Sequence, residues 1–91
     1  MSNTIKITQI KNLLTKAFNP ITLEIIDDSH HHIGHVGSQN GAGHYRITII
    51  SQSFAGLKML ARHQLVYNVL ADLMKTEIHA LSMKTLTIEE Q

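Results

Sequence analysis

The residues best suited to chemistry gather in one histidine-rich segment. Residues 28–37 read Asp-Ser-His-His-His-Ile-Gly-His-Val-Gly and hold four of the chain's seven histidines. Imidazole is the commonest side-chain metal ligand, and its unperturbed charge change falls near neutral pH. Rigid scaffolds usually present such groups on loops. The segment is therefore a candidate ligand donor, pH-sensitive surface or polar turn, through His30, His31, His32 and His35.

The histidine-rich segment lies between two predicted β-strands, residues 21–27 and 44–51. Both stretches alternate apolar and polar residues and are rich in β-branched side chains. Because one loop joins them, we expect an antiparallel pair. The loop is longer than a tight hairpin needs, and long loops of unusual composition are more often functional. The side chains predicted to face the core are Ile21, Leu23, Ile25, Tyr45, Ile47 and Ile49.

Helices are predicted on both sides of this strand pair. Residues 5–18 carry apolar groups at spacings of three and four, and Asn19-Pro20 ends the pattern. Residues 57–74 have a helical composition, but one continuous helix would put Arg62 in the middle of the apolar arc. We therefore expect a short helix near 57–61 and a longer one that starts near Arg62. His63 would then lie near a helix N-terminus, where the dipole favours a neutral imidazole.

The remaining residues complete a small α+β fold. Residues 53–56 predict a turn, and residues 78–84 predict a third strand that a helical crossover would place parallel in the sheet. Residues 87–90, Thr-Ile-Glu-Glu, fit a capping box at the start of a short terminal helix. The predicted order is α-β-β-α-α-β-α, in a single domain over residues 1–91.

The composition of the chain argues against several classes of function. The apolar fraction of 43% and the charged fraction of 16% are ordinary for a folded protein. The formal net charge of +1 is too small for a protein organised around phosphate binding. The chain contains no cysteine, which excludes disulfides and thiolate metal sites. Because we find neither a bilayer-spanning apolar run nor a secretory signal, we expect a cytoplasmic protein. No catalytic constellation is visible in the sequence, and we expect no enzyme.

Six short motifs, taken together in this order and spacing, resemble the BolA-like proteins. The resemblance runs from residue 23 to residue 90. It implies a fold related to the class II KH domain, with a three-stranded sheet covered by helices on one face. This agrees with the element order predicted from the residues. The motifs are residues 28–35, 43–47, 54–56, 62–67, 78–81 and 87–90.

The resemblance also implies a partner and a cofactor. BolA-like proteins associate with monothiol glutaredoxins and share a bridging [2Fe–2S] cluster, which glutathione and a glutaredoxin cysteine ligate on the other side. Carried over by position, the ligands on this chain are His63 and either His32 or His35. Neutral nitrogen ligands raise the potential of such a cluster, and protonation should weaken binding below about pH 6. Arg62 and Tyr67 are expected to contact the partner.

Other readings remain open from the sequence. A KH-like surface suggests DNA or RNA binding and transcriptional control of morphology or stress genes, with Lys58, Arg62 and Lys75 as the cationic residues. These three are too scattered to form a convincing basic stripe. Another reading is divalent metal binding or pH sensing by the histidine loop without a partner. We expect structural roles for His44 and His79, which fall on predicted strands.

Overall fold

Helix α1 opens the fold and has one buried face. The computed structural model describes residues 2–28 and 43–91, and α1 spans Ser2–Phe18. Its buried apolar residues Ile10, Leu14 and Phe18 recur every fourth position and therefore lie on one side of the helix. Asn19 ends α1 with a positive φ of 45°, and its N–H donates to the Thr15 carbonyl at 2.9 Å. The helix predicted over residues 5–18 is confirmed and begins at Ser2.

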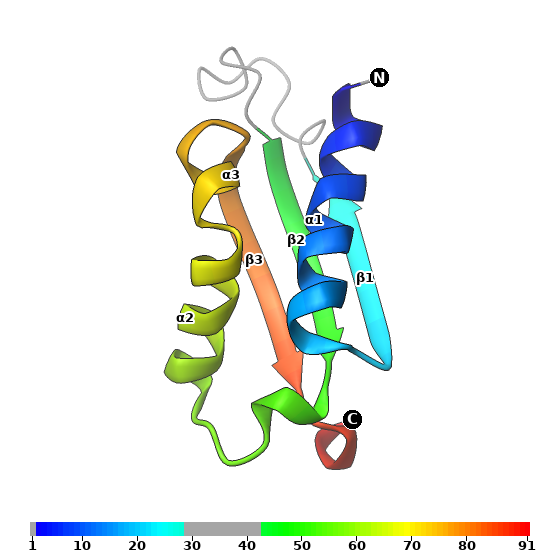
Figure 1. The fold of residues 1–91 in the computed structure, drawn as a ribbon, viewed down its shortest axis with the longest axis vertical. Helices are drawn as coiled ribbons and strands as arrows, with labels where there is room; N and C mark the ends of the chain where they lie inside the picture. The colour runs from blue at the N-terminus through cyan, green and yellow to red at the C-terminus, as the bar shows by residue number, and fades with distance from the viewer. Residues whose placement is uncertain (1, 29–42) are drawn as a thin grey trace.

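Three strands form a mixed sheet in the order β1-β2-β3 (Figure 1). β1 spans Thr22–Asp27 and pairs antiparallel with β2, Gly43–Ile50. β3 spans Ile78–Leu86 and runs parallel to β2. Both predicted pairings, antiparallel around the histidine loop and parallel through a helical crossover, are confirmed.

The helices cover one face of this sheet (Figure 1). Tyr45, Ile47 and Ile49 of β2 point into the core and are buried, as their alternation predicts. The prediction for Ile21 is wrong, because its side chain is 57% exposed. Ile21 precedes the first residue of β1, so the alternation of that strand does not fix its direction.

The second helical stretch breaks at a different place from the predicted one. α2 spans Met59–Val69 and α3 spans Ala71–Thr76, with the change of direction at Leu70. Arg62 does lie within the buried arc of α2, and the predicted break before it is wrong. The charged guanidinium of Arg62 is stable in this buried position because the Leu57 carbonyl and the Glu90 carboxylate accept its hydrogen bonds.

Two short 3-10 turns complete the chain. η3, Gln52–Phe54, leads into the predicted turn, where Gly56 has a φ of 78°. η4, Ile88–Glu90, is the predicted terminal helix with its capping-box residues, and the Thr87 N–H donates to Glu90 Oε1 at 2.8 Å. The arrangement is an α+β fold compatible with the class II KH-like description. No helix in residues 2–28 or 43–91 is long and apolar enough to cross a membrane.

Candidate functional site

The two described ends of the histidine loop, Asp28 and Gly43, lie at the end of the sheet where β3 begins. Asp28 follows β1, and its N–H donates to the His44 carbonyl at 2.7 Å. Gly43 begins β2 opposite Ile78, the first residue of β3. The strand register then skips His79, through an irregularity between Gly43 and His44. Segments that are far apart in the sequence therefore come together where the histidine loop leaves and rejoins the sheet.

This sheet end brings two histidine rings into contact. The ring centroids of His44 and His79 are 4.9 Å apart, with an angle of 44° between the planes. His79 is exposed and His44 is half-buried. Both histidines lie on strands, as the sequence predicts. The contact gives the described part of the chain an imidazole pair directly beside the ends of the histidine loop.

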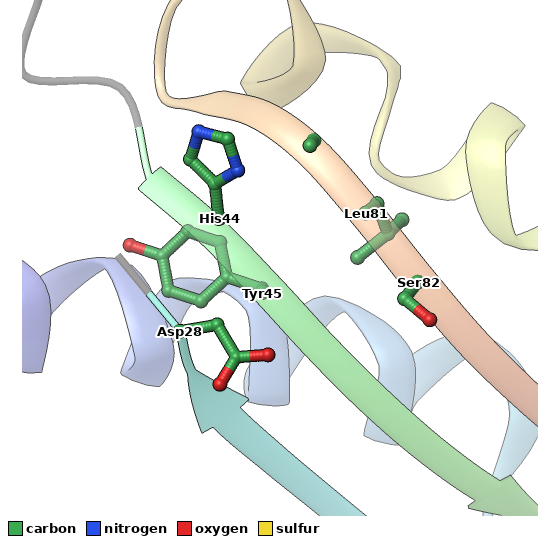
Figure 2. A pocket seen from close by; sticks show the side chains of 6 residues that line it. Asp28, His44, Tyr45, Leu81 and Ser82 are labelled. Carbon is green, nitrogen blue, oxygen red and sulfur yellow. The ribbon is translucent and has the colours of Figure 1, made fainter. Parts of the chain in front are cut away.

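A shallow pocket of about 200 Å³ opens at the same sheet end. Figure 2 shows His44 and Tyr45 on β2, Asp28 after β1, and Leu81 and Ser82 on β3 around it. The Asp28 carboxylate accepts two hydrogen bonds from Arg46, at 3.0 and 2.8 Å, and is therefore held as the charged partner of an exposed guanidinium. The pocket offers an imidazole, a carboxylate and a hydroxyl.

Tyr45 supports this sheet end from the core side. Burial is the main reason that the pKa of its hydroxyl rises to about 12, and the nearby carboxylates of Asp27 and Glu77 raise it further. The ring lies across Gly43, where an added Cβ would come within 2.5 Å of Tyr45 Cε2. Only glycine leaves room for the ring at the start of β2.

The predicted loop ligands cannot be placed. His32 and His35, together with His30 and His31, lie outside the described residues. Their assignment as ligands stays a prediction.

His63, the other predicted ligand, lies on α2 and is half-buried. Its Nε2 is buried and has no hydrogen-bond partner among the described residues. The fold therefore makes no use of this nitrogen as a donor or acceptor. Because the atom is buried, it would reach an iron atom outside the chain only after the side chain changes rotamer.

His63 is also distant from the loop ends. Its neighbour Arg62 donates to the Thr85 carbonyl at 3.0 Å, which fixes this part of α2 beside the far end of β3. From Ile78 to Thr85, a strand rise of about 3.3 Å per residue corresponds to roughly 20 Å. Gly43 is paired with Ile78, so the described end of the histidine loop lies that far from His63 along the sheet.

Arg62 has an internal role. Its side chain is 8% exposed, and it donates to Glu90 Oε1 at 2.6 Å and to Glu90 Oε2 at 2.9 Å. These hydrogen bonds raise the pKa of Arg62 and lower that of Glu90 to about 2. The geometry does not support the predicted contacts of Arg62 with a protein partner or with nucleic acid, because its donors are turned into the fold.

The other predicted contact residues lie at the surface. Tyr67 is 40% exposed on α2 and is accessible to a partner. Lys58 is exposed at the N-terminal cap of α2. Lys75 is exposed, with its ammonium 3.6 Å from the Asp72 carboxylate. Of the three cations predicted for nucleic acid, Lys58 alone is both exposed and without an ion pair to another described residue.

The described residues offer metal donors singly and not as a cluster. Within residues 2–28 and 43–91, no three histidine, aspartate or glutamate side chains are grouped closely enough to hold a metal ion. Single imidazoles at His63 and His79 remain, and imidazole nitrogen is a known replacement for thiolate in [2Fe–2S] clusters.

Sequence reasoning missed two features of the surface. The contact between His44 and His79 depends on the strand irregularity at Gly43, which no local sequence pattern predicts. The exposed lysines of α1, Lys11 and Lys16, belong to no motif that the sequence analysis singles out. Reading the charges of the two long helices together would have found the second feature.

These observations define a class of small α+β protein, in which helices cover one face of a β1-β2-β3 sheet and a histidine-rich segment joins the first two strands. The family model for BolA-like proteins matches residues 14–90, so the chain belongs to the BolA-like protein family.

Relatives of known name agree with this assignment. The chain is 37% identical over 82 residues to the DNA-binding transcriptional regulator BolA of Escherichia coli K12, covering 90% of this chain and 75% of that one. It is 40% identical to the protein of the same name from Vibrio cholerae, covering 89% of this chain and 74% of that one.

Solved structures show the same fold. The BolA domain of SufE1 from Arabidopsis thaliana superimposes with a TM-score of 0.82 at 36% identity, and BolA1 from the same plant with 0.81 at 33%. Each comparison covers 92% of this chain and 93% of the other.

Proposed function

We propose that this protein is a non-enzymatic partner of a monothiol glutaredoxin and holds a [2Fe–2S] cluster jointly with it, for cluster transfer or iron sensing. The observation that carries the proposal is the imidazole pair at the end of the sheet. The exposed ring of His79 contacts His44 where the four-histidine segment leaves and rejoins the described strands. The family resemblance supplies the identity of the partner and the cluster.

The ligands on this chain are one loop histidine, His32 or His35, and one imidazole from the described residues. Two candidates exist for the latter. His63 is the residue that the family motif indicates, and its Nε2 is not used by the fold. His79 is exposed and lies one residue from the partner of Gly43, whereas His63 is roughly 20 Å along the sheet. Geometry therefore favours His79, and a shared site needs only one of them.

Anaerobic reconstitution with a monothiol glutaredoxin, glutathione, iron and sulfide tests both parts of the proposal. We expect the visible absorption and circular dichroism of the mixture to differ from those of the glutaredoxin alone. Among single alanine variants, the true ligands should change this spectrum. His31→Ala is the matched control, because it removes a loop imidazole that is not a proposed ligand.

Two outcomes would count against this proposal in different ways. An identical spectrum with and without this protein would exclude the joint cluster. A changed spectrum that persists in both His63→Ala and His79→Ala would retain the partnership and reject the described ligands. Loss of the spectral change in His79→Ala but not in His63→Ala would identify His79 as the ligand.

DNA binding, with transcriptional regulation, is a second candidate function. The relatives from Escherichia coli and Vibrio cholerae are named as DNA-binding transcriptional regulators, and the chain covers about three quarters of each. A low net charge of +1 predicts weak, salt-sensitive binding. Measuring affinity for duplex DNA at low salt, and its decline as salt rises, tests this function.

A further inference from the structure

The charges of the molecule are unevenly distributed between its elements. Neither α1 nor α2 contains an aspartate or a glutamate. The carboxylates of the chain lie on or beside β1, on or just after α3, and at the C-terminal turn. Exposed lysines lie on the helical layer: Lys11 and Lys16 on α1, and Lys58 at the start of α2. The carboxylate residues are Glu24, Asp27, Asp28, Asp72, Glu77, Glu89 and Glu90.

The other cations of the two helices are neutralised within the fold. Lys6 is buried, with its ammonium 3.6 Å from the Glu77 carboxylate. Arg62 is held by Glu90. By contrast, the three exposed lysines form no ion pair with any described residue. The outer surface of α1 and α2 is therefore positive, although the whole chain is close to neutral.

The two helices present this charge on one surface. α1 and α2 lie on the same face of the sheet (Figure 1). The hydroxyls of Ser51 and Ser53 donate to the Phe18 carbonyl at 2.6 and 3.3 Å, which holds the end of α1 beside the segment that leads into α2. Lys16 in the last turn of α1 and Lys58 at the start of α2 are thus at the same end of the layer, and Lys11 extends the charge along α1.

The exposed side chains of α1 and α2 indicate which kind of polyanion this surface binds. Proteins that bind single-stranded nucleic acid stack the bases on exposed aromatic side chains. Phe18, Tyr45 and Phe54 are buried, and Tyr67 is the one large aromatic side chain exposed in the described residues. A surface with separated cations and a single exposed aromatic ring, Tyr67 of α2, cannot stack successive bases and suits the regular phosphate backbone of a duplex.

We propose that the outer surface of α1 and α2 binds the phosphate backbone of double-stranded DNA through Lys11, Lys16 and Lys58. This inference rests on the second proposed function, DNA binding, and names its surface. The binding is independent of base sequence. Three phosphate contacts correspond to a slope of about −2.7 in log affinity against log salt, or about a 40-fold loss between 50 and 200 mM salt.

Fluorescence anisotropy with a short labelled duplex of mixed sequence tests this surface. In the triple variant Lys11→Gln, Lys16→Gln, Lys58→Gln, we expect affinity at low salt to fall more than tenfold and the salt slope to approach zero. Lys84→Gln is the matched control. It removes the same charge from β3, between the inward-packed Met83 and Thr85, and therefore from the sheet face opposite the helices. It should lower affinity less than twofold. Thermal melting confirms that each variant is folded.

The possible results distinguish an error in the proposed lysine surface from an error in the proposed DNA binding. If the unmodified protein fails to bind the duplex at low salt, both DNA binding and this inference are wrong. Equal binding by the triple variant would overturn the surface and leave DNA binding standing. Tighter binding to a single strand of the same sequence would overturn the duplex as the ligand. If the triple variant keeps DNA affinity but loses association with the glutaredoxin, the lysines serve an acidic protein surface and the inference is again wrong.

Discussion

At the scale of single residues, Tyr45 buries a polar hydroxyl, and a buried hydroxyl without a hydrogen bond lowers the stability of the fold. Its hydroxyl is buried and has no hydrogen-bond partner among the described residues. Removing a buried hydroxyl that makes no hydrogen bond removes its desolvation penalty. We expect Tyr45→Phe to leave the free energy of unfolding unchanged or to raise it by about 1 kcal/mol. Urea unfolding measures this, with the exposed Tyr67→Phe as control.

A loss of more than about 1 kcal/mol in Tyr45→Phe would show that the hydroxyl is hydrogen-bonded after all. The same variant has a signature at high pH. Because burial raises the folded-state pKa of Tyr45 to about 12, the unfolded chain ionises first and stability falls between pH 10 and 12. Tyr45→Phe removes that part of the alkaline loss.

At the scale of elements, the C-terminal turn is fastened to α2 by one ion pair. Hydrogen bonds from Arg62, followed by one from the Thr87 N–H, lower the pKa of Glu90 from 4.5 to about 2. A carboxyl with a lowered folded-state pKa stabilises the fold above its ordinary pKa, and the stability is lost as pH falls from 4.5 to 2. We expect Glu90→Gln to lower Tm at neutral pH and to flatten the acid dependence in that range.

Circular dichroism melts at neutral pH and at steps down to pH 2 measure this effect. The curves of Glu90→Gln and the unmodified protein should draw together as pH falls toward 2 and converge below it, where Glu90 is protonated in both the folded and the unfolded state. Glu89→Gln is the control, because it makes the same change on the exposed neighbouring residue. A Tm loss as large in Glu89→Gln would show that net charge, and not the Arg62 contact, is responsible.

The elements also show what the sequence could and could not predict. Alternation identified the inward residues of β2, because the pleat forces alternate side chains to opposite faces. The connections, one loop and one helical crossover, predicted the mixed sheet. Periodicity misplaced the helix break, because it treats Arg62 as excluded from an apolar arc. Glu90, 28 residues away, makes that position favourable. The same limit applies to His79, which reaches His44 through a register irregularity that local spacing cannot reveal.

At the scale of the whole molecule, the two proposed activities occupy opposite ends if His79, and not His63 on α2, is the cluster ligand. The imidazole pair lies at the start of β2, beside Gly43. The Phe18 carbonyl is bound by Ser51, which directly follows β2, so the end of α1 and its Lys16 lie at the other end of that strand. A strand of this length spans roughly 23 Å. In that case, the proposed cluster site and the proposed DNA surface share no described residue.

This separation predicts independent behaviour. Substitutions more than about 10 Å apart with no common partner usually act additively, within about 0.5 kcal/mol. The triple lysine variant should reconstitute the cluster spectrum fully, and His79→Ala should bind duplex DNA as the unmodified protein does. In the combined variant, the fold change in DNA affinity should equal that of the lysine variant alone. A larger loss in the combination would mean that the two ends of the molecule are coupled.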